Sequence, residues 1–198
     1  VLTHEIMNSL TPINALAGNL LDENRMDRPT LSLIADSSRS LLDFVKRFRK
    51  YTIIPEPQPK VISVKPFLEK AMVLASGLEK AKGIEFSLFV NPPDAMAYAD
   101  ETMLSLAVSN ILKNAVEASP SRITVSAYIR KDESVEIRIS NNGEPIPADV
   151  AAQIFTPFFT TKPTGSGVGL SLSQRMIHRM SGTLTLISPS PTTFSIII

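Results

Sequence analysis

Residues 165–170 read Gly165-Ser-Gly-Val-Gly-Leu170, and the pattern of a helix follows directly. Three of the eight glycines of the chain fall within this short stretch. Glycines at a helix N-terminus leave backbone N–H groups accessible beside the positive end of the helix dipole, so the stretch predicts a phosphate-binding loop. Its spacing differs from the dinucleotide-binding fingerprint, and no Lys-Ser or Lys-Thr pair follows as in a Walker A loop.

The segment before this loop reads Ile154-Phe-Thr-Pro-Phe-Phe-Thr-Thr-Lys162. Aromatic side chains such as Phe155 can anchor it, and Lys162, Pro163 and the glycines follow the anchors. We interpret the segment as a hinged lid over a ligand. A glycine-rich loop without a function is the alternative.

A helix predicted over residues 101–118 carries two different stripes. The apolar stripe consists of Leu104, Ala107, Val108, Ile111 and Ala115. The polar stripe follows the spacing i, i+3, i+4, i+7 and consists of Asn110, Lys113, Asn114 and Glu117. Asn is a mediocre helix former, whereas its amide oxygen is a hard ligand for Mg²⁺ and Lys is a point charge for phosphate. Taken alone, however, the stripe is better explained as a solvated helix face.

A third stretch, Ile139-Ser-Asn-Asn-Gly-Glu-Pro-Ile-Pro147, ends a predicted strand and turns into a helix. Gly143 allows a close backbone approach there that a side chain would block. On its own, this stretch is best interpreted as a plain strand-to-helix turn.

Residues 1–52 show two helical patterns with seven-residue apolar repeats. The repeats are Ile6, Leu10, Ile13, Ala17 and Leu20 in the first helix, and Leu31, Ile34, Ser38, Leu41, Val45 and Phe48 in the second. Two helices cannot enclose a core alone, so we expect an antiparallel hairpin that forms a four-helix bundle with a second copy. Packing of the hairpin on its own chain is the alternative.

The first helix carries one of the two histidines of the chain. His4 lies about 200° around the helix from the apolar stripe and is predicted to be exposed. Asn8, at i+4, shares its face, and Glu5 is adjacent. In isolation, an exposed histidine is usually only a surface residue. His178 has no partner at a useful spacing, and we interpret it as structural.

The rest of the chain has a different organisation. Residues 53–60 contain three alternating prolines and predict a semi-rigid linker. From residue 61 onwards, strand-like and helical patterns alternate and predict an α+β fold with helices on a mixed sheet. The expected strands are 84–90, 123–129, 135–139, 183–187 and 193–198, and the expected helices are 66–81, 101–118, 148–155 and 168–181.

Composition excludes several classes of protein. Twenty Lys and Arg against nineteen Asp and Glu leave a net charge of +1, which argues against nucleic-acid binding. The absence of cysteine excludes disulfides, zinc-thiolate sites and a cysteine nucleophile. No apolar run is long enough to span a membrane, so we expect no membrane contact within this sequence, while a longer parent protein can still be membrane-anchored. A start at Val1 suggests a piece of a longer protein.

In this order, the motifs resemble the catalytic core of a bacterial sensor histidine kinase over essentially the whole chain. His4-Glu5-Ile-Met-Asn8 resembles the H-box, Asn110-Ile-Leu-Lys-Asn114 the N-box, Asn141-Asn-Gly143 the G1 box, Phe155-x-x-Phe158-Phe159 the F-box, and Gly165-x-Gly167-x-Gly169 the G2 box. Thr192-Thr-Phe194 resembles the closing strand of the ATP-binding domain.

The resemblance implies a dimerisation and phosphotransfer hairpin over residues 1–52 and a Bergerat-type α/β sandwich over 61–198 that binds ATP. It implies that His4 is autophosphorylated with the help of Glu5, and that the phosphoryl group passes to an Asp of a response regulator. Asn8 would position a water for dephosphorylation of the regulator, and Asn114 would ligate Mg²⁺. The implied ATP-binding residues are Asn110, Lys113, Asn114, Asn141, Gly143, Phe155, Lys162, Gly165, Gly167, Gly169, Leu170 and Thr192.

Two positions depart from the family pattern. The G1 box normally begins with an Asp that accepts a hydrogen bond from the adenine amino group, and Asn141 stands there instead. The Asn141 oxygen can still accept that bond, but its charge-assisted form is lost, which corresponds to about 1 kcal/mol. Pro145 replaces the second Gly. Both departures favour an alternative, a degenerate kinase that acts as a dimeric scaffold or phosphatase. Another ATPase of the same superfamily is a further alternative.

Overall fold

The computed structural model describes residues 10–17, 28–52, 54–162 and 165–198. The chain divides into two compact units, Val1–Ile54 and Pro55–Ile198, which are described separately. The predicted phosphotransfer residues His4, Glu5 and Asn8 lie outside the described residues.

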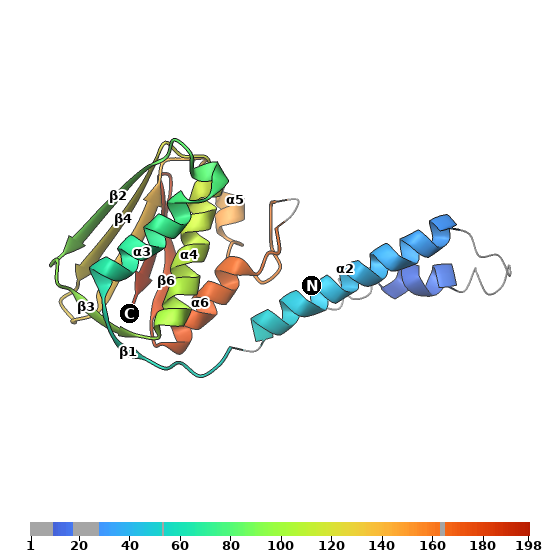
Figure 1. Cartoon of the computed structure of the whole chain (residues 1–198), viewed down its shortest axis with the longest axis horizontal. Coiled ribbons are helices and arrows are strands. Elements are labelled where there is room, and N and C mark those ends of the chain that lie inside the picture. The colour runs from blue at the N-terminus through green and yellow to red at the C-terminus, as the bar shows by residue number, and fades with distance from the viewer. Residues whose placement is uncertain (1–9, 18–27, 53, 163–164) are drawn as a thin grey trace. The chain divides into compact units, whose positions relative to one another are not determined.

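The described part of the first unit is helical (Figure 1). One helix covers residues 10–17, and α2 covers Arg28–Thr52. Pro29 suits the first turn of α2, because a proline there removes an N–H group that has no partner within the helix. Several large apolar side chains of α2 are exposed by 42–60%, namely Leu31, Leu33, Leu42 and Val45. An apolar surface of this kind is typical of a helix that packs against a partner.

The second unit contains two sheets. A five-stranded sheet has the order β2-β4-β5-β7-β6, and a separate two-stranded sheet pairs β1 with β3. Strands β2 and β4 are parallel, and the other neighbours in the large sheet are antiparallel. The strands are β1 (Lys60–Ser63), β2 (Glu85–Asn91), β3 (Met96–Ala99), β4 (Arg122–Ile129), β5 (Val135–Asn141), β6 (Thr183–Pro189) and β7 (Thr192–Ile197).

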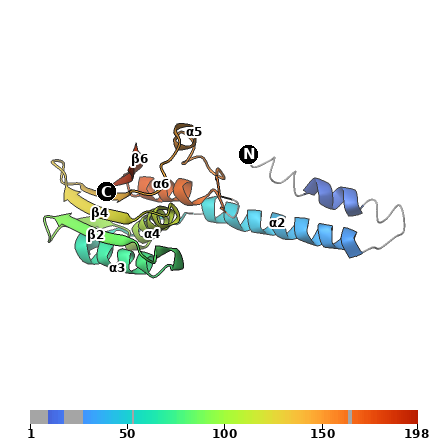
Figure 2. The same ribbon diagram turned by 90° about the horizontal axis from the view of Figure 1, so that it is seen from above.

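Three helices cover one face of the large sheet, α3 (Val64–Ser76), α4 (Glu101–Glu117) and α6 (Gly169–Arg179) (Figures 1 and 2). Apolar side chains from the helices and from alternate strand positions close the core between them. Leu68, Leu104, Ile111, Ile123, Ile137, Ile177 and Leu184 are all less than 2% exposed. The predicted fold class, a mixed sheet with helices on one face, is confirmed.

Some predicted elements have different limits in the structure. The helix predicted over 148–155 covers only Ala148–Ala151, which is α5, and the chain then continues in turns. The helix does not continue because the N–H groups of Gln153 and Thr156 bond the carbonyls three residues back, those of Val150 and Gln153, as in turns. The helix predicted over 66–81 ends at Ser76, and a short 3₁₀ helix follows at Glu79–Ala81.

The sequence patterns did not predict β1 and β3, since four residues are too few for a clear alternation. Strand β1 begins inside the segment interpreted as a linker. Gln58, just before it, donates its backbone N–H to Asp100 over 2.8 Å. Asp100 also caps α4 by accepting the N–H of Met103 over 2.9 Å. These two hydrogen bonds lower the pKa of Asp100, the bond from Gln58 most strongly.

Within the residues that the structure describes, no helix combines the length and the apolar character that crossing a membrane requires.

Candidate functional site

Helix α4 presents a polar stripe to the first turn of α6. Asn110 donates its Nδ2 group to the hydroxyl of Ser173 over 3.1 Å, and that hydroxyl donates to the carbonyl of Gly169 over 3.0 Å. A Cβ atom on Gly169 would lie 2.6 Å from Oδ1 of Asn110. Glycine at position 169 thus lets the start of α6 approach the Asn110 amide, which would have to shift to make room for a side chain.

The C-terminal turn of α4 carries a charged cluster. Nζ of Lys162 donates to Oδ1 of Asn114 over 3.1 Å and also to the carboxylate of Glu117. Nζ of Lys113 lies 3.9 Å from the same carboxylate. Two oxygen donors of α4 thus converge on a positive charge, and carboxylate and amide oxygens are the donors that Mg²⁺ prefers. The described residues contain no cluster of three or more His, Cys, Asp or Glu side chains that could hold a metal ion.

Glu117 was not among the predicted site residues, although it belongs to the polar stripe at i+7 from Asn110. The sequence signal was its position on the same helix face as Asn114. Its contact with Lys162 could not be predicted, because 45 residues separate the two in the chain.

A neutral polar group lies at the end of β5. Asn141 is only 4% exposed, and its Oδ1 accepts the backbone N–H of Gly143 over 3.1 Å. In the β5–β7 register Asn141 is opposite Thr192, which is also 4% exposed and donates its hydroxyl to the carbonyl of Pro189 over 3.0 Å. The structure thus brings together two predicted site residues that are 51 positions apart.

The turn after β5 packs tightly against the end of α4. A Cβ atom on Gly143 would lie 2.3 Å from the carbonyl oxygen of Ala118. The same oxygen accepts the N–H of Glu144 over 3.0 Å. This contact holds Asn141 close to the helix end that carries the charged cluster.

The predicted lid is anchored on the core at one end. The rings of Phe155 and Phe194 meet edge to face, with centroids 6.3 Å apart and an interplanar angle of 90°. Phe194 is buried on β7. Phe155 thus fixes the segment that leads to Lys162. Leu170, at the start of α6, is partly buried against the core.

The glycines of the predicted lid permit close backbone contacts. Gly167 has φ +63°, and a Cβ atom there would lie 2.3 Å from the carbonyl carbon of Phe158. The N–H of Phe158 donates to the carbonyl of Gly167 over 2.7 Å. A Cβ atom on Gly165 would lie 2.2 Å from the hydroxyl oxygen of Thr160. A side chain at position 167 would therefore collide with the Phe158 backbone, and one at position 165 with the Thr160 hydroxyl.

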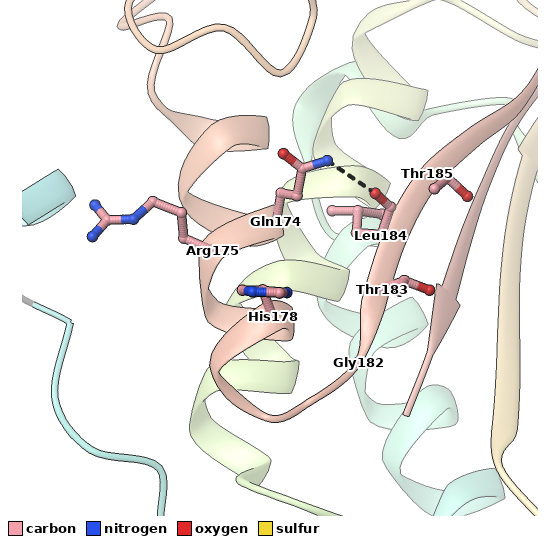
Figure 3. Close-up of a pocket in the computed structure, with 7 residues that line it drawn as sticks. All are labelled: Gln174, Arg175, His178, Gly182, Thr183, Leu184 and Thr185. Atoms are coloured by element: carbon pink, nitrogen blue, oxygen red, sulfur yellow. Dashed lines mark hydrogen bonds between the residues drawn. The ribbon is translucent and has the colours of Figure 1, made fainter.

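A groove of about 330 Å³ lies elsewhere, between α6 and β6 (Figure 3). Nε2 of Gln174 donates across it to the carbonyl of Leu184 over 3.2 Å. His178 is exposed beside it, and the Arg175 side chain points away from β6. None of the predicted site residues lines this groove. The candidate site therefore remains at the C-terminal end of α4.

The chain belongs to the family described as histidine kinase-, DNA gyrase B- and HSP90-like ATPases, whose model matches residues 99–198. This region contains α4, the end of β5, the predicted lid and β7, and hence all the predicted ATP-binding residues. The predicted resemblance to a sensor histidine kinase core is confirmed.

Several relatives align with nearly the whole chain. The signal transduction histidine-protein kinase AtoS of Escherichia coli is 28% identical over 93% of this chain and 31% of its own length. The sensory histidine kinase/phosphatase NtrB of Rhizobium leguminosarum bv. phaseoli is 29% identical over 100% of this chain and 56% of its own length. The chain thus spans between about a third and somewhat more than half of these relatives.

The solved structures of histidine kinase ThkA share the fold. Its nucleotide-free catalytic domain matches 71% of this chain and 95% of its own length with a TM-score of 0.63 and 26% identity. The complex of ThkA with the response regulator protein TrrA matches 100% of this chain and 59% of the ThkA chain, with a TM-score of 0.68 and 23% identity.

Proposed function

We propose that this chain is the catalytic core of an ATP-dependent protein histidine kinase in a two-component system. The observation that carries the proposal is the convergence of Asn114, Glu117 and Lys162 at one end of α4, within a domain of an ATPase family. This arrangement combines cation-binding oxygens with an ammonium group, which is what the triphosphate of a nucleotide requires.

ATP would bind with its triphosphate at this charged cluster and its base near Asn141 and Thr192. Lys162 and Lys113 would exchange their contacts with Glu117 for phosphate oxygens, since both are ammonium groups on long flexible stems. The N-terminus of α6 and the lid glycines would supply backbone N–H groups. The oxygens of Asn114 and Glu117 would hold Mg²⁺, which, when bound, supplies compensation for charge on the phosphates.

His4 would be the nucleophile. A neutral imidazole has a free lone pair near pH 7, because its ordinary pKa is about 6.5. The nitrogen forms a bond to the γ-phosphorus while the bond to the bridging oxygen breaks, and ADP leaves with that electron pair. Glu5 accepts the proton of the other ring nitrogen, which keeps the imidazole neutral during attack.

The phosphoryl group would then pass to an Asp of a response regulator, and a homodimer would present the histidines. The exposed apolar side chains of α2 favour a second copy of the hairpin as the partner. The ThkA structure in complex with a response regulator favours a receiver domain as acceptor. We place this chemistry in the cytoplasm, where ATP and regulators are found.

The decisive experiment is incubation with γ-labelled ATP and Mg²⁺, with and without the substitution His4→Gln. Label that is acid-labile and alkali-stable, and that disappears in His4→Gln, is expected for a histidine kinase. Nucleotide binding without labelling would indicate a scaffold. Acid-stable label, or phosphate release that does not depend on His4, would indicate another ATPase of the superfamily.

We also propose a phosphatase activity towards the regulator, and the relative NtrB is itself described as a kinase/phosphatase. The Asn8 amide can both donate and accept hydrogen bonds, which suits the positioning of a water. Asn8→Ala should abolish dephosphorylation of the regulator and spare autophosphorylation. Unchanged rates of both reactions would contradict this role.

A further inference from the structure

The orientation of the Asn141 amide is determined by its neighbour. Only the oxygen of a carboxamide can accept a hydrogen bond, so the N–H of Gly143, 3.1 Å away, identifies the bound atom as Oδ1. Nδ2 therefore points away from Gly143. Gly143 is itself held against Ala118 at the end of α4, which leaves the amide little freedom to reverse.

The Nδ2 group of Asn141 is available to a ligand. Every buried side-chain nitrogen and oxygen among the described residues has a hydrogen-bond partner. Nδ2 has none among these residues, so this atom is not fully buried although the residue as a whole is 4% exposed. The site thus presents a neutral hydrogen-bond donor at this position, and no negative charge.

Thr192, opposite Asn141 in the sheet register, supplies a hydrogen-bond acceptor beside this donor. Its hydroxyl hydrogen is directed to the carbonyl of Pro189, so its oxygen lone pairs remain able to accept. The two residues together offer one donor and one acceptor from the same face of the sheet.

This pair is compatible with both classes of purine. Adenine presents an acceptor at N1 and a donor at its 6-amino group, whereas a 6-oxopurine presents a donor at N1 and an acceptor at O6. Asn141 can donate to N1 of adenine or to O6 of a 6-oxopurine, and Thr192 can accept from the remaining group. A carboxylate at position 141 would instead place a negative charge against O6.

We infer that Asn141 relaxes the base specificity of the site, so that it accepts 6-oxopurine nucleoside triphosphates as well as ATP. The inference rests on the proposed nucleotide-binding function and names the class of base that the site tolerates. It makes Asn141 a determinant of specificity through the free donor of its amide.

The test compares dissociation constants of Mg²⁺–ATP and Mg²⁺–ITP for the whole chain by calorimetry. ITP carries a 6-oxo group without the 2-amino group of guanine, so it isolates the contact at position 6. We expect the two constants to differ by less than about tenfold in the natural chain. The isosteric substitution Asn141→Asp retains the acceptor for Gly143 and should raise the ITP-to-ATP ratio by at least about tenfold.

Asn142→Asp is the matched control. It adds the same charge one residue away, but the Asn142 side chain bonds Ser121 and Arg122 instead. Its ITP-to-ATP ratio should equal that of the natural chain. A ratio above about tenfold in the natural chain, or an equal ratio in Asn141→Asp, would overturn the inference and leave the kinase proposal intact.

Failure of both nucleotides to bind the natural chain would instead overturn the proposed function together with this inference. The ratio of the ITP and ATP dissociation constants of the natural chain tests the inference even if Asn141→Asp does not fold. Thermal unfolding of each variant shows whether it folds.

Discussion

The two ends of the candidate site are built in different ways. At one end Asn141 and Thr192 are neutral, 4% exposed, and held by hydrogen bonds to backbone groups. At the other end the Lys162 and Glu117 side chains are charged and 46% and 23% exposed. The first end is part of the sheet, whereas the second joins a helix to a loop.

This difference indicates how each end recognises its ligand. A buried neutral pair discriminates by the direction of its hydrogen bonds, because a mismatched donor or acceptor stays desolvated and unpaired. An exposed ion pair costs little to break, because solvent screens it. We therefore expect the neutral end to be sensitive to small changes of shape, and the charged end to matter for chemistry more than for folding.

The largest effect is expected at the charged end. Asn114→Ala removes an oxygen that binds a cation, and should slow autophosphorylation about 100-fold. The measurement is the initial rate of labelling of His4 over a range of Mg²⁺ concentrations. Leu106→Ala is the control, since Leu106 lies on the same helix and is 54% exposed. An unchanged labelling rate in Asn114→Ala would contradict the assignment of Asn114 to the site.

At the neutral end, Gly143→Ala tests how rigidly the turn is held. The added Cβ would meet the Ala118 carbonyl oxygen at 2.3 Å, so the turn must shift, and the free energy of unfolding should fall by about 1–3 kcal/mol. Urea denaturation measures it. Gly77→Ala is the control, because its Cβ would meet only ordinary contacts of 3.5 Å or more at φ −74°. Equal stability of the two variants would contradict the tight packing.

The N-terminal end of α4 lies at the opposite end of the helix from the charged cluster. A substitution there tests whether a loss of stability alone changes nucleotide binding. Asp100→Ala removes the acceptor for the N–H groups of Gln58 and Met103 and should cost about 1 kcal/mol of unfolding free energy at pH 7. ATP affinity, measured in parallel, should not change. If the free energy of ATP binding decreased as much as the free energy of unfolding, we would conclude that this helix end is coupled to the site.

The cost of Asp100→Ala should depend on pH. Because folding lowers the pKa of Asp100, its contribution is complete above the unfolded pKa of about 3.9 and disappears as the pH falls through the lower folded value. The stability difference between the natural chain and Asp100→Ala should therefore shrink below about pH 4. A difference that stays constant down to pH 2 would argue against an ionised cap.

The smallest effect on stability is expected for Lys162→Met. The exposed pair with Glu117 should contribute less than about 0.5 kcal/mol to the free energy of unfolding. ATP affinity should nevertheless decrease, and it should depend less steeply on salt, because one positive charge is lost. A large loss of stability would mean that the lid contact supports the fold.

Long, strongly periodic elements were predictable from the sequence, and short ones were not. The helix expected at 101–118 is observed at Glu101–Glu117, because its apolar spacing and the cap at Asp100 agree. Strands β1 and β3 have four residues each and are defined by their pairing with each other. Their existence depends on contacts between Lys60–Ser63 and Met96–Ala99, which local patterns do not contain.

For the site, the sequence by itself determined which residues share a helix face, since Asn110, Asn114 and Glu117 follow the period of the helix. It also determined where glycine permits close approach before α6. Tertiary structure decided the rest. Pairing of β5 with β7 places Asn141 opposite Thr192, and a loop distant in sequence brings Lys162 to α4. These contacts result from packing of the whole core, because residues 48 and 51 positions apart have no local interaction that could bring them together.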